Sequence, residues 1–328
     1  MKKRRLGKTG FEVSELSLGT WQVGGKWGSG FDDALAESIL EEAVDAGVNF
    51  IDTADVYEDR RSEAAVGRVV RRRTERVYVA TKCGRFIDPH VDAGYTPEAL
   101  RGYVERSLKN SGLDALDLVQ LHCPPTPVYY RPEIFELFDR LKDEGKILNL
   151  GVSVEKVEEA LKAIEYPNVT TVQIIFNMFR QRPAELFFPE AAKKDVGIIV
   201  RVPLASGLLT GRYARDTAFA PDDHRNFNRD GKAFDKGETF SGVPYETGLD
   251  AVDELKAAFP GEANLAPRAL RWILDHPDVS TVIPGASKAE HLRSNLAAAS
   301  LPPLSGEQRR VVDEVYRTRI RGLVHHLW

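Results

Sequence analysis

The sequence predicts an α/β protein built as a (β/α)₈ TIM barrel, and three observations carry this prediction. Eight short apolar runs of β-strand character alternate with segments whose apolar residues recur at helical spacing. Several of the runs end on titratable residues, as parallel barrel strands do where they reach the active-site face. The glycine-rich G-x-G-x-x-G turn of a doubly wound open sheet is absent, which disfavours the main alternative.

The candidate strands are spread along the chain, and most are followed by a candidate helix. They are the runs 15–19, 49–52, 76–82, 116–122, 147–153, 169–176, 197–202 and 279–283. A chain of 328 residues lies within the size that such a barrel reaches as one domain. We therefore predict a single barrel domain over residues 1–328.

Helix boundaries are marked by capping residues. A helix beginning near residue 35 is predicted to end at Gly47, and another opens with Thr96 as N-cap, Pro97 in its first turn and Gly112 at its end. Further helices are predicted to end at Gly145, to cover 184–194 and to begin near 288. These helices are expected to form the outer ring of the barrel.

Two segments do not fit the strand–helix repeat. Residues 5–13 have the pattern of a small β-hairpin turning at 8–10, which we expect to cover the bottom of the barrel. Residues 212–248 form a long loop after strand 7, rich in Asp, Arg and Gly but holding five aromatic residues. That aromatic content is too high for a plain disordered linker, so the loop is either a candidate lid or an ordered decoration.

Composition excludes several classes of partner. The net charge of −4 and the absence of a basic face argue against nucleic acid, and no run of 18 apolar residues predicts a membrane span. No apolar region follows the basic N-terminal residues, and Cys83 and Cys123 fit a reducing compartment, so we expect a cytoplasmic protein. No Cys/His spacing suggests a metal site, and oligomeric state is not predicted.

Four titratable residues at strand ends are the candidate catalytic group. Asp52, Lys82 and His122 each end an apolar run, and Tyr57 follows Asp52 by five residues. A lysine ammonium favours the phenolate, so Lys82 is expected to lower the pKa of Tyr57 and make it a usable general acid. Asp52 would keep Lys82 protonated, and His122 would hydrogen-bond a carbonyl oxygen. This combination suits carbonyl reduction.

A second candidate site lies after the last strand. Ser287 and Glu290 have the S-x-x-E spacing of a capping box at a helix N-terminus, and Lys288 adds a positive charge. Such a terminus attracts an anion, and barrels of this kind often bind phosphate after strands 7 and 8. Gly285 would allow a ligand to approach the backbone closely. A purely structural helix cap is the alternative.

The motifs resemble those of the aldo-keto reductase superfamily over essentially the whole chain. Residues 5–11 and 18–21 resemble its N-terminal hairpin and first strand, and 52–57 resemble its second-strand signature. Lys82 and His122 complete the family's tetrad. The segments 204–211 and 283–287 resemble its two late cofactor segments.

The resemblance implies NADPH-dependent reduction of an aldehyde or ketone without a metal, with NADH as the other possible cofactor. Tyr57 would be the general acid, tuned by Lys82 and Asp52, and His122 would orient the carbonyl group; the substrate would be a small carbonyl compound or alcohol. The implied cofactor-binding residues are Gly19, Thr20, Trp21, Ser153, Gln173, Arg201, Pro203, Leu204, Ser206, Gly207, Leu209, Gly285, Ser287, Lys288, His291 and Asn295.

The chain departs from the family pattern at several cofactor positions. Val154 stands where many members have Asn, and Arg201 stands where many stack an aromatic ring on the nicotinamide. A guanidinium can also stack, and its charge would favour the neutral reduced nicotinamide. His291 and Ser294 replace the usual Arg and Glu near the adenosine, which leaves Ser287, Lys288 and Arg293 to favour NADPH.

Two other functions remain open at the level of sequence. One is a non-catalytic regulatory subunit that binds a nicotinamide nucleotide, as channel β-subunits of this superfamily illustrate. The other is a Schiff-base lyase with Lys82 as nucleophile. The substrate is not predicted, although an apolar pocket near the strand ends is expected from Trp21, Trp27, Phe86, Tyr129, Tyr130 and Met178.

Overall fold

Eight parallel strands form the barrel in the computed structural model, which describes residues 1–25 and 30–328. Each strand pairs with the strand before and after it in the chain, so the spatial order follows the sequence order from β3 to β10. The strands are β3 (Leu18–Gly19), β4 (Phe50–Asp52), β5 (Tyr78–Cys83), β6 (Leu118–His122), β7 (Leu150–Ser153), β8 (Val169–Ile175), β9 (Gly197–Arg201) and β10 (Val279–Val282). The predicted fold is confirmed.

The barrel closes where its last strand meets its first. Two isolated parallel bridges join this seam, one between Leu16 and Val282 and the other between Gly19 and Gly285. Gly19 permits the close approach, because a Cβ built on it would lie 2.8 Å from the carbonyl oxygen of Ile283. The seam is therefore narrow and made largely of backbone.

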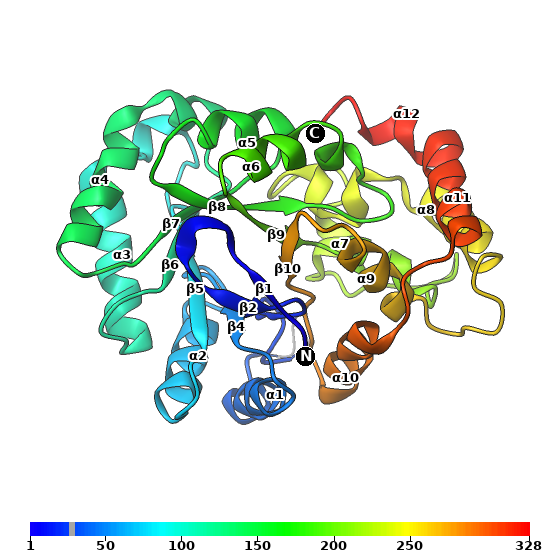
Figure 1. Cartoon of the computed structure of the whole chain (residues 1–328), viewed down its shortest axis with the longest axis horizontal. Helices are drawn as coiled ribbons and strands as arrows, with labels where there is room; N and C mark the ends of the chain where they lie inside the picture. The colour runs from blue at the N-terminus through cyan, green and yellow to red at the C-terminus, as the bar shows by residue number, and fades with distance from the viewer. Residues whose placement is uncertain (26–29) are drawn as a thin grey trace.

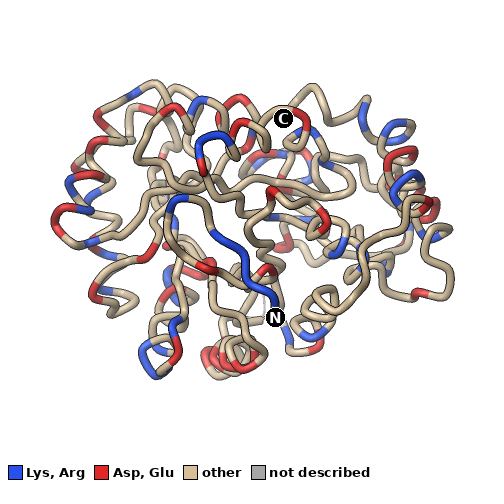
Figure 2. The backbone as a smooth tube through the Cα atoms, viewed as in Figure 1, with Lys and Arg blue, Asp and Glu red and all other residues tan. Residues whose placement is uncertain are grey.

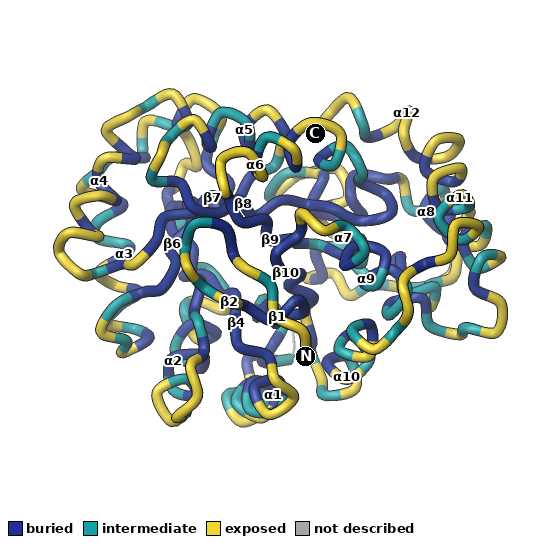
Figure 3. The backbone as a smooth tube through the Cα atoms, in the orientation of Figure 1, coloured by how far each residue is buried: buried dark blue, intermediate teal, exposed yellow. Residues whose placement is uncertain are grey.

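Helices surround the strands and turn their polar sides outward (Figures 1 and 3). Those that follow the first six barrel strands are α1 (Asp33–Asp45), α2 (Arg61–Arg71), α3 (Pro97–Ser111), α4 (Pro132–Asp143), α5 (Val157–Ala163) and α6 (Phe187–Lys193). Those that follow the last two are α7 (His224–Phe227), α8 (Tyr245–Lys256), α9 (Ala266–Leu274), α10 (Ala289–Leu296), α11 (Gly306–Val315) and α12 (Arg321–Val324).

The helix ends follow the predicted capping chemistry. Thr96 accepts a hydrogen bond from the backbone N–H of Ala99 at 3.1 Å, and Pro97 begins α3. Gly112 and Gly145 both have left-handed backbone conformations, with φ of 67° and 72°, after α3 and α4. These positions confirm that the predicted capping residues mark the ends of these helices.

The N-terminal hairpin covers the bottom of the barrel, as predicted. Its strands β1 (Lys3–Arg5) and β2 (Glu12–Ser14) pair antiparallel around a short 3₁₀ turn. Leu6 and Val13 are fully buried and belong to one cluster with barrel residues such as Phe50 and Ile199. The hairpin thus seals the end of the barrel away from the strand C-termini.

Acidic and basic residues face one another on α1 and α2 (Figure 2). Glu37 on α1 pairs with Arg68 at 2.6 Å and with Arg72 at 2.7 Å, and Asp45 pairs with Arg73 at 2.6 Å. The arginine cluster that follows α2 is therefore largely matched by carboxylates of the neighbouring helix. No helix of the described chain is long and apolar enough to cross a membrane.

The long loop after β9 is an ordered wall. Its short helical turns, η6 (Lys236–Glu238) and η7 (Phe240–Gly242), lie between α7 and α8. Phe219 packs edge-on against Tyr245 at 5.9 Å between ring centroids, and Phe240 lies 5.2 Å from the same tyrosine. The aromatic residues of this loop therefore pack against one another and hold the loop together.

Candidate active site

The four candidate catalytic residues meet at the C-terminal ends of neighbouring strands. Asp52 ends β4, Lys82 lies in β5 and His122 ends β6, while Tyr57 reaches them from the loop after β4. Parallel strands bring their C-terminal ends to one face of a barrel, which is why residues 30 to 70 positions apart in sequence come together here. The ring centroids of Tyr57 and His122 are 6.0 Å apart in an edge-on arrangement.

Lys82 is the centre of this group. Its Nζ donates to Asp52 Oδ1 at 2.5 Å, to the carbonyl oxygen of Thr53 at 2.9 Å and to Tyr57 Oη at 3.2 Å. Burial alone would lower the pKa of Lys82, but the charge of Asp52 and the contact with Tyr57 raise it above its usual value. The side chain is therefore an ammonium held against the phenol.

Two glutamines hold Asp52 from the barrel interior. Gln120 Nε2 donates to Asp52 Oδ2 at 3.0 Å, and Gln173 Nε2 donates to the same oxygen at 2.8 Å. Sequence reasoning missed Gln120, although it lies two residues before His122 and therefore on the same face of the strand. The amide nitrogen of Gln173, one of the implied cofactor-binding residues, is committed to Asp52 here.

The pKa of Tyr57 shifts in the direction opposite to the one expected from the sequence. Desolvation raises the pKa of Tyr57 above its usual value, and the opposing charge of Lys82 lowers it by less. The phenol is therefore fully protonated at neutral pH. This is the form that a proton donor requires, so the correction changes the tuning of the residue and leaves its predicted role intact.

His122 is a neutral imidazole. Burial, followed by the charges of Arg85, Lys82 and Arg201, holds the pKa of His122 well below its usual range. Its Nδ1 is buried and has no hydrogen-bond partner in the part of the chain that the structure describes. A neutral imidazole keeps one N–H, which can donate to an oxygen placed in the adjoining cavity.

A cavity of about 500 Å³ opens from the tetrad toward α10, a size typical of small-molecule sites. Asp52, Tyr57 and His122 lie in its wall. The implied cofactor residues in the wall are Gly19, Thr20, Trp21, Ser153, Gln173, Arg201, Pro203, Leu204, Ser206, Gly207, Gly285, His291 and Asn295.

Three implied cofactor residues lie elsewhere. Leu209 is buried in the core, and Ser287 and Lys288 are outside the wall of the cavity. The predicted capping box is wrong, because Lys288 is the N-cap of α10 without a side-chain cap. The Ser287 hydroxyl instead lies 3.2 Å from His291 Nδ1, and Lys288 pairs with Glu290 at 2.9 Å. Because α10 begins one residue later than predicted, Ser287 precedes the N-cap position and does not form the box with Glu290.

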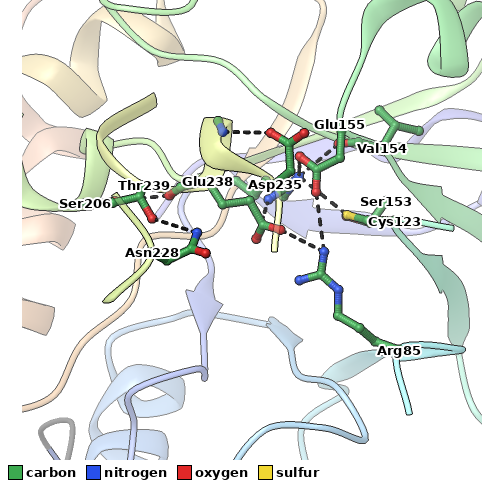
Figure 4. Close-up of polar contacts among 12 residues, drawn as sticks. Arg85, Cys123, Ser153, Val154, Glu155, Ser206, Asn228, Asp235, Glu238 and Thr239 are labelled. Carbon is green, nitrogen blue, oxygen red and sulfur yellow. Dashed lines mark hydrogen bonds and ion pairs between the residues drawn. The ribbon is translucent and has the colours of Figure 1, made fainter. Parts of the chain in front are cut away.

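Arg201 lies in a buried ion cluster with Arg85, Glu155 and Glu238, three residues that sequence reasoning missed and that Figure 4 labels. Its guanidinium donates to Glu155 at 2.9 Å and to Glu238 at 3.1 Å. Arg85 donates to the same two carboxylates, at 3.4 Å and 2.7 Å. The positive charge expected beside the nicotinamide is therefore compensated. We name Arg85, Glu155, Arg201 and Glu238 the mouth cluster.

The two carboxylates of the mouth cluster differ in acidity. Burial raises the pKa of Glu155, and the charge of Arg201 opposes this only in part. Burial acts on Glu238 in the same direction, but Arg85 and Arg201 outweigh it and lower the pKa of that carboxyl. Glu238 is consequently the firmly ionised member, and it lines the cavity. Cys123 lies beside the cluster, with its sulfur 3.5 Å from Arg201.

The expected apolar substrate pocket is largely wrong. Trp21 does border the cavity, with its ring 6.2 Å from that of Tyr57. Tyr129 and Met178 are buried in the core, and Tyr130 is 64% exposed. Phe86 stacks on Tyr103, and Trp27 lies outside the described residues. Most of these aromatics serve packing, and the wall of the cavity combines polar residues with apolar ones such as Pro203, Leu204 and Ile283.

Comparison with known proteins identifies the class of protein to which this barrel belongs. The model of the aldo/keto reductase family matches residues 15–317. The chain belongs to the aldo/keto reductase family. The predicted enzyme class is thereby confirmed.

Relatives of known name match nearly the full chain. An uncharacterized oxidoreductase of Bacillus subtilis, YqkF, is 30% identical over 94% of each chain. The NADH-specific methylglyoxal reductase of Escherichia coli is 29% identical over 92% of this chain and 94% of its own. Among solved structures, the glycerol dehydrogenase AKR11B4 from Gluconobacter oxydans has a TM-score of 0.78 and 29% identity, covering 97% of this chain and 96% of its own.

Proposed function

We propose that this protein reduces an aldehyde or ketone to an alcohol with NADPH, and that Tyr57 is its general acid. The observation that carries the proposal is the contact between Lys82 Nζ and Tyr57 Oη at 3.2 Å, with Asp52 2.5 Å from the same ammonium. A protonated phenol that an ammonium can stabilise as phenolate is a proton donor suited to an oxygen that becomes an alkoxide.

Each member of the tetrad has one task in this reaction. His122 donates its N–H to the carbonyl oxygen and fixes its position beside Tyr57. Tyr57 then transfers its proton to that oxygen, and the ammonium of Lys82 stabilises the resulting phenolate. Asp52, held by Gln120 and Gln173 at 3.0 and 2.8 Å, keeps Lys82 charged and aimed at the phenol.

The cavity fits a nicotinamide nucleotide. The polar wall from Ser153 and Gln173 to His291 and Asn295 joins the tetrad to α10. Arg201 also lies in that wall, where its guanidinium is held by Glu155 and Glu238. When bound, the reduced nicotinamide supplies the hydride that makes the reaction a reduction.

Lys288 favours NADPH over NADH. Its pairing with Glu290 is exposed, with 51% of the lysine side chain accessible, so little free energy is lost when it turns to a phosphate. Arg212 lines the cavity nearby. The NADH-specific relative uses the other cofactor, which makes cofactor preference a necessary measurement. The relative that is a glycerol dehydrogenase is consistent with a small, hydroxylated substrate.

Tyr57→Phe tests the mechanism. We expect NADPH binding to be retained and carbonyl reduction to fall by about 10²–10⁴, because the acid is lost while the ring remains. Turnover is followed by NADPH absorbance over a panel of carbonyl substrates, and binding by fluorescence titration. Tyr130→Phe, which removes a hydroxyl from an exposed tyrosine away from the cavity, is the matched control. Undiminished turnover in Tyr57→Phe would contradict the proposal.

Lys288→Ala tests the cofactor. The affinity for NADPH is expected to fall by about five- to tenfold while that for NADH stays nearly constant, since only NADPH carries the 2′-phosphate. Lys109→Ala, at an exposed lysine on α3, controls for a general loss of charge. Equal losses for the two cofactors would place the 2′-phosphate elsewhere.

The lyase alternative is disfavoured by the state of Lys82. A Schiff base requires a neutral amine, and the pKa of Lys82 lies above its usual value because Asp52 and Tyr57 outweigh burial. Failure of borohydride to trap a carbonyl adduct on Lys82 is the expected result.

A further inference from the structure

Glu238 is an ionised carboxylate in the cavity wall, and it is carried by a tightly folded segment. Residues 235–242 contain the two short turns η6 and η7, in which Phe240 and Ser241 have φ values of 52° and 59°. Such left-handed conformations cost free energy in non-glycine residues and persist only where contacts on both sides enforce them. The contacts on the cavity side are those with Arg85, Arg201 and Ser206.

The contacts on the opposite side come from Arg180 and Trp328. Arg180 is 1% exposed and donates to the carbonyl oxygens of Gly237 and Ser241, each at 3.3 Å. Its guanidinium lies 4.1 Å from the centroid of the Trp328 ring. The side chain thus ties both turns to the indole behind them.

The indole of Trp328 packs closely against residues 235–242. Its Nε1 donates to Asp235 Oδ1 at 2.8 Å, and the same oxygen accepts from the backbone N–H of Gly237 at 2.7 Å. A Cβ built on Gly242 would lie 2.6 Å from the indole, and one on Gly237 would lie 2.8 Å from it. The indole therefore fills the space that these two glycines leave open.

Burial makes Arg180 dependent on the indole. Desolvation lowers the pKa of Arg180 to about 10, and its Nε has no partner among residues 1–25 and 30–328. It has no ion pair with a carboxylate within 4 Å in the described chain. Its charge is compensated by the two carbonyl oxygens, by the π face of Trp328 and by the more distant charges of Glu155 and Asp235. Removing the indole would leave a buried cation and a hole behind η6.

We propose that Arg180 and Trp328 form a clamp that positions Glu238 in the wall of the active-site cavity, which makes Trp328 a positioning residue for the reaction. The statement about the reaction rests on the proposed function. Glu238 in turn holds Arg85 and Arg201, whose charges add to the effect of burial in lowering the pKa of His122. The clamp therefore acts on the part of the cavity wall formed by Glu238, Arg201 and Ser206.

The test compares Trp328→Ala with Leu327→Ala, which changes the neighbouring side chain, 46% exposed. Hydrogen exchange of the amides in 235–243 is expected to accelerate at least about tenfold in Trp328→Ala and to stay unchanged in the control. This measurement needs no substrate. Wild-type protection of these amides in Trp328→Ala would overturn the clamp, whether or not the protein reduces carbonyls.

Kinetics supply the second readout. Trp328→Ala is expected to lower kcat/KM by about tenfold to 10²-fold, as small displacements in an active site do. Glu238→Gln should produce a similar loss, and the double variant should lie within about twofold of Glu238→Gln alone, because both changes act through one group. Multiplying losses would overturn the proposal. A wild-type protein that reduces no carbonyl would refute the proposed function, and the exchange result would still decide the clamp.

Trp328→Phe covers the case in which Trp328→Ala does not fold. Phenylalanine keeps a ring over Arg180 but loses the hydrogen bond to Asp235. Intermediate losses of protection and of kcat/KM are expected. Wild-type values for both would overturn the clamp.

Discussion

Replacing Asp55 with asparagine should stabilise the protein at alkaline pH and have far less effect in acid. Asp55 follows β4, is 2% exposed, and neither carboxyl oxygen has a hydrogen-bond partner in the described chain. Burial, with a smaller contribution from the charge of Glu63, raises its pKa from 3.8 to about 7. The ionised form is therefore unfavourable in the folded protein.

The sign and size of this effect of pH on stability follow from the difference in proton binding between the folded and unfolded states. The folded state holds the Asp55 proton more tightly than the unfolded state, so stability falls as pH rises from about 4 to about 7 and levels off above that. A shift of about 3 units at 1.36 kcal/mol each corresponds to a cost of about 4 kcal/mol at high pH. About 3 kcal/mol of this develops between pH 5 and pH 8.5.

The assay is urea unfolding of wild type and Asp55→Asn at pH 5 and pH 8.5. Asparagine has the same shape and no charge, so the free energy of unfolding of the variant should exceed that of wild type by about 3 kcal/mol more at pH 8.5 than at pH 5. Asp114→Asn, at an exposed acid before β6, should show no such pH dependence. A constant difference between wild type and Asp55→Asn at both pH values would refute the reasoning.

Two further predictions concern helices and are read from thermal unfolding. Thr96→Ala removes the N-cap bond of α3 and should cost about 1 kcal/mol, whereas Thr74→Ala in an exposed turn should change stability by less than about 0.5 kcal/mol. Gly67→Ala should cost about 1–3 kcal/mol, because its Cβ would lie 2.0 Å from the carbonyl oxygen of Ser111 and force α2 away from α3. Gly322→Ala in α12, with nothing within 4 Å, should instead stabilise by about 0.5–1 kcal/mol. Equal effects at the two glycines would contradict this account.

Three members of the tetrad were predictable because they end apolar runs, and parallel topology then brings the ends of these runs together. Asp52, Lys82 and His122 need no further information than the strand pattern. Gln120 was within reach of the same logic, since alternate residues of a strand share a face. The direction of the pKa shift of Tyr57 was not predictable in this way. It depends on how far burial outweighs the charge of Lys82, and the spacing of residues in the sequence carries no information about burial.

The mouth cluster could not be predicted from the sequence, for a different reason. Arg85 and Glu155 follow strands by only two or three residues, but Glu238 belongs to a turn 37 residues after Arg201. Loop residues carry no periodicity that fixes where they point, so their partners appear only with the tertiary structure. The failed capping box is similar, since a shift of one residue in the start of α10 gives Ser287 a new partner.

The seam of the barrel has a consequence for the order in which the protein is made. Gly19 and Gly285 bridge the first and last strands, and both border the cavity. During synthesis the strands from β3 onward can pair in turn, but the edge of β3 stays unpaired until residue 285 has emerged. The cavity that we assign to the nucleotide is thus completed by the last pairing of the barrel. A ligand that spans this seam would join the earliest and latest strands, and would favour closure over edge-to-edge association of nascent chains.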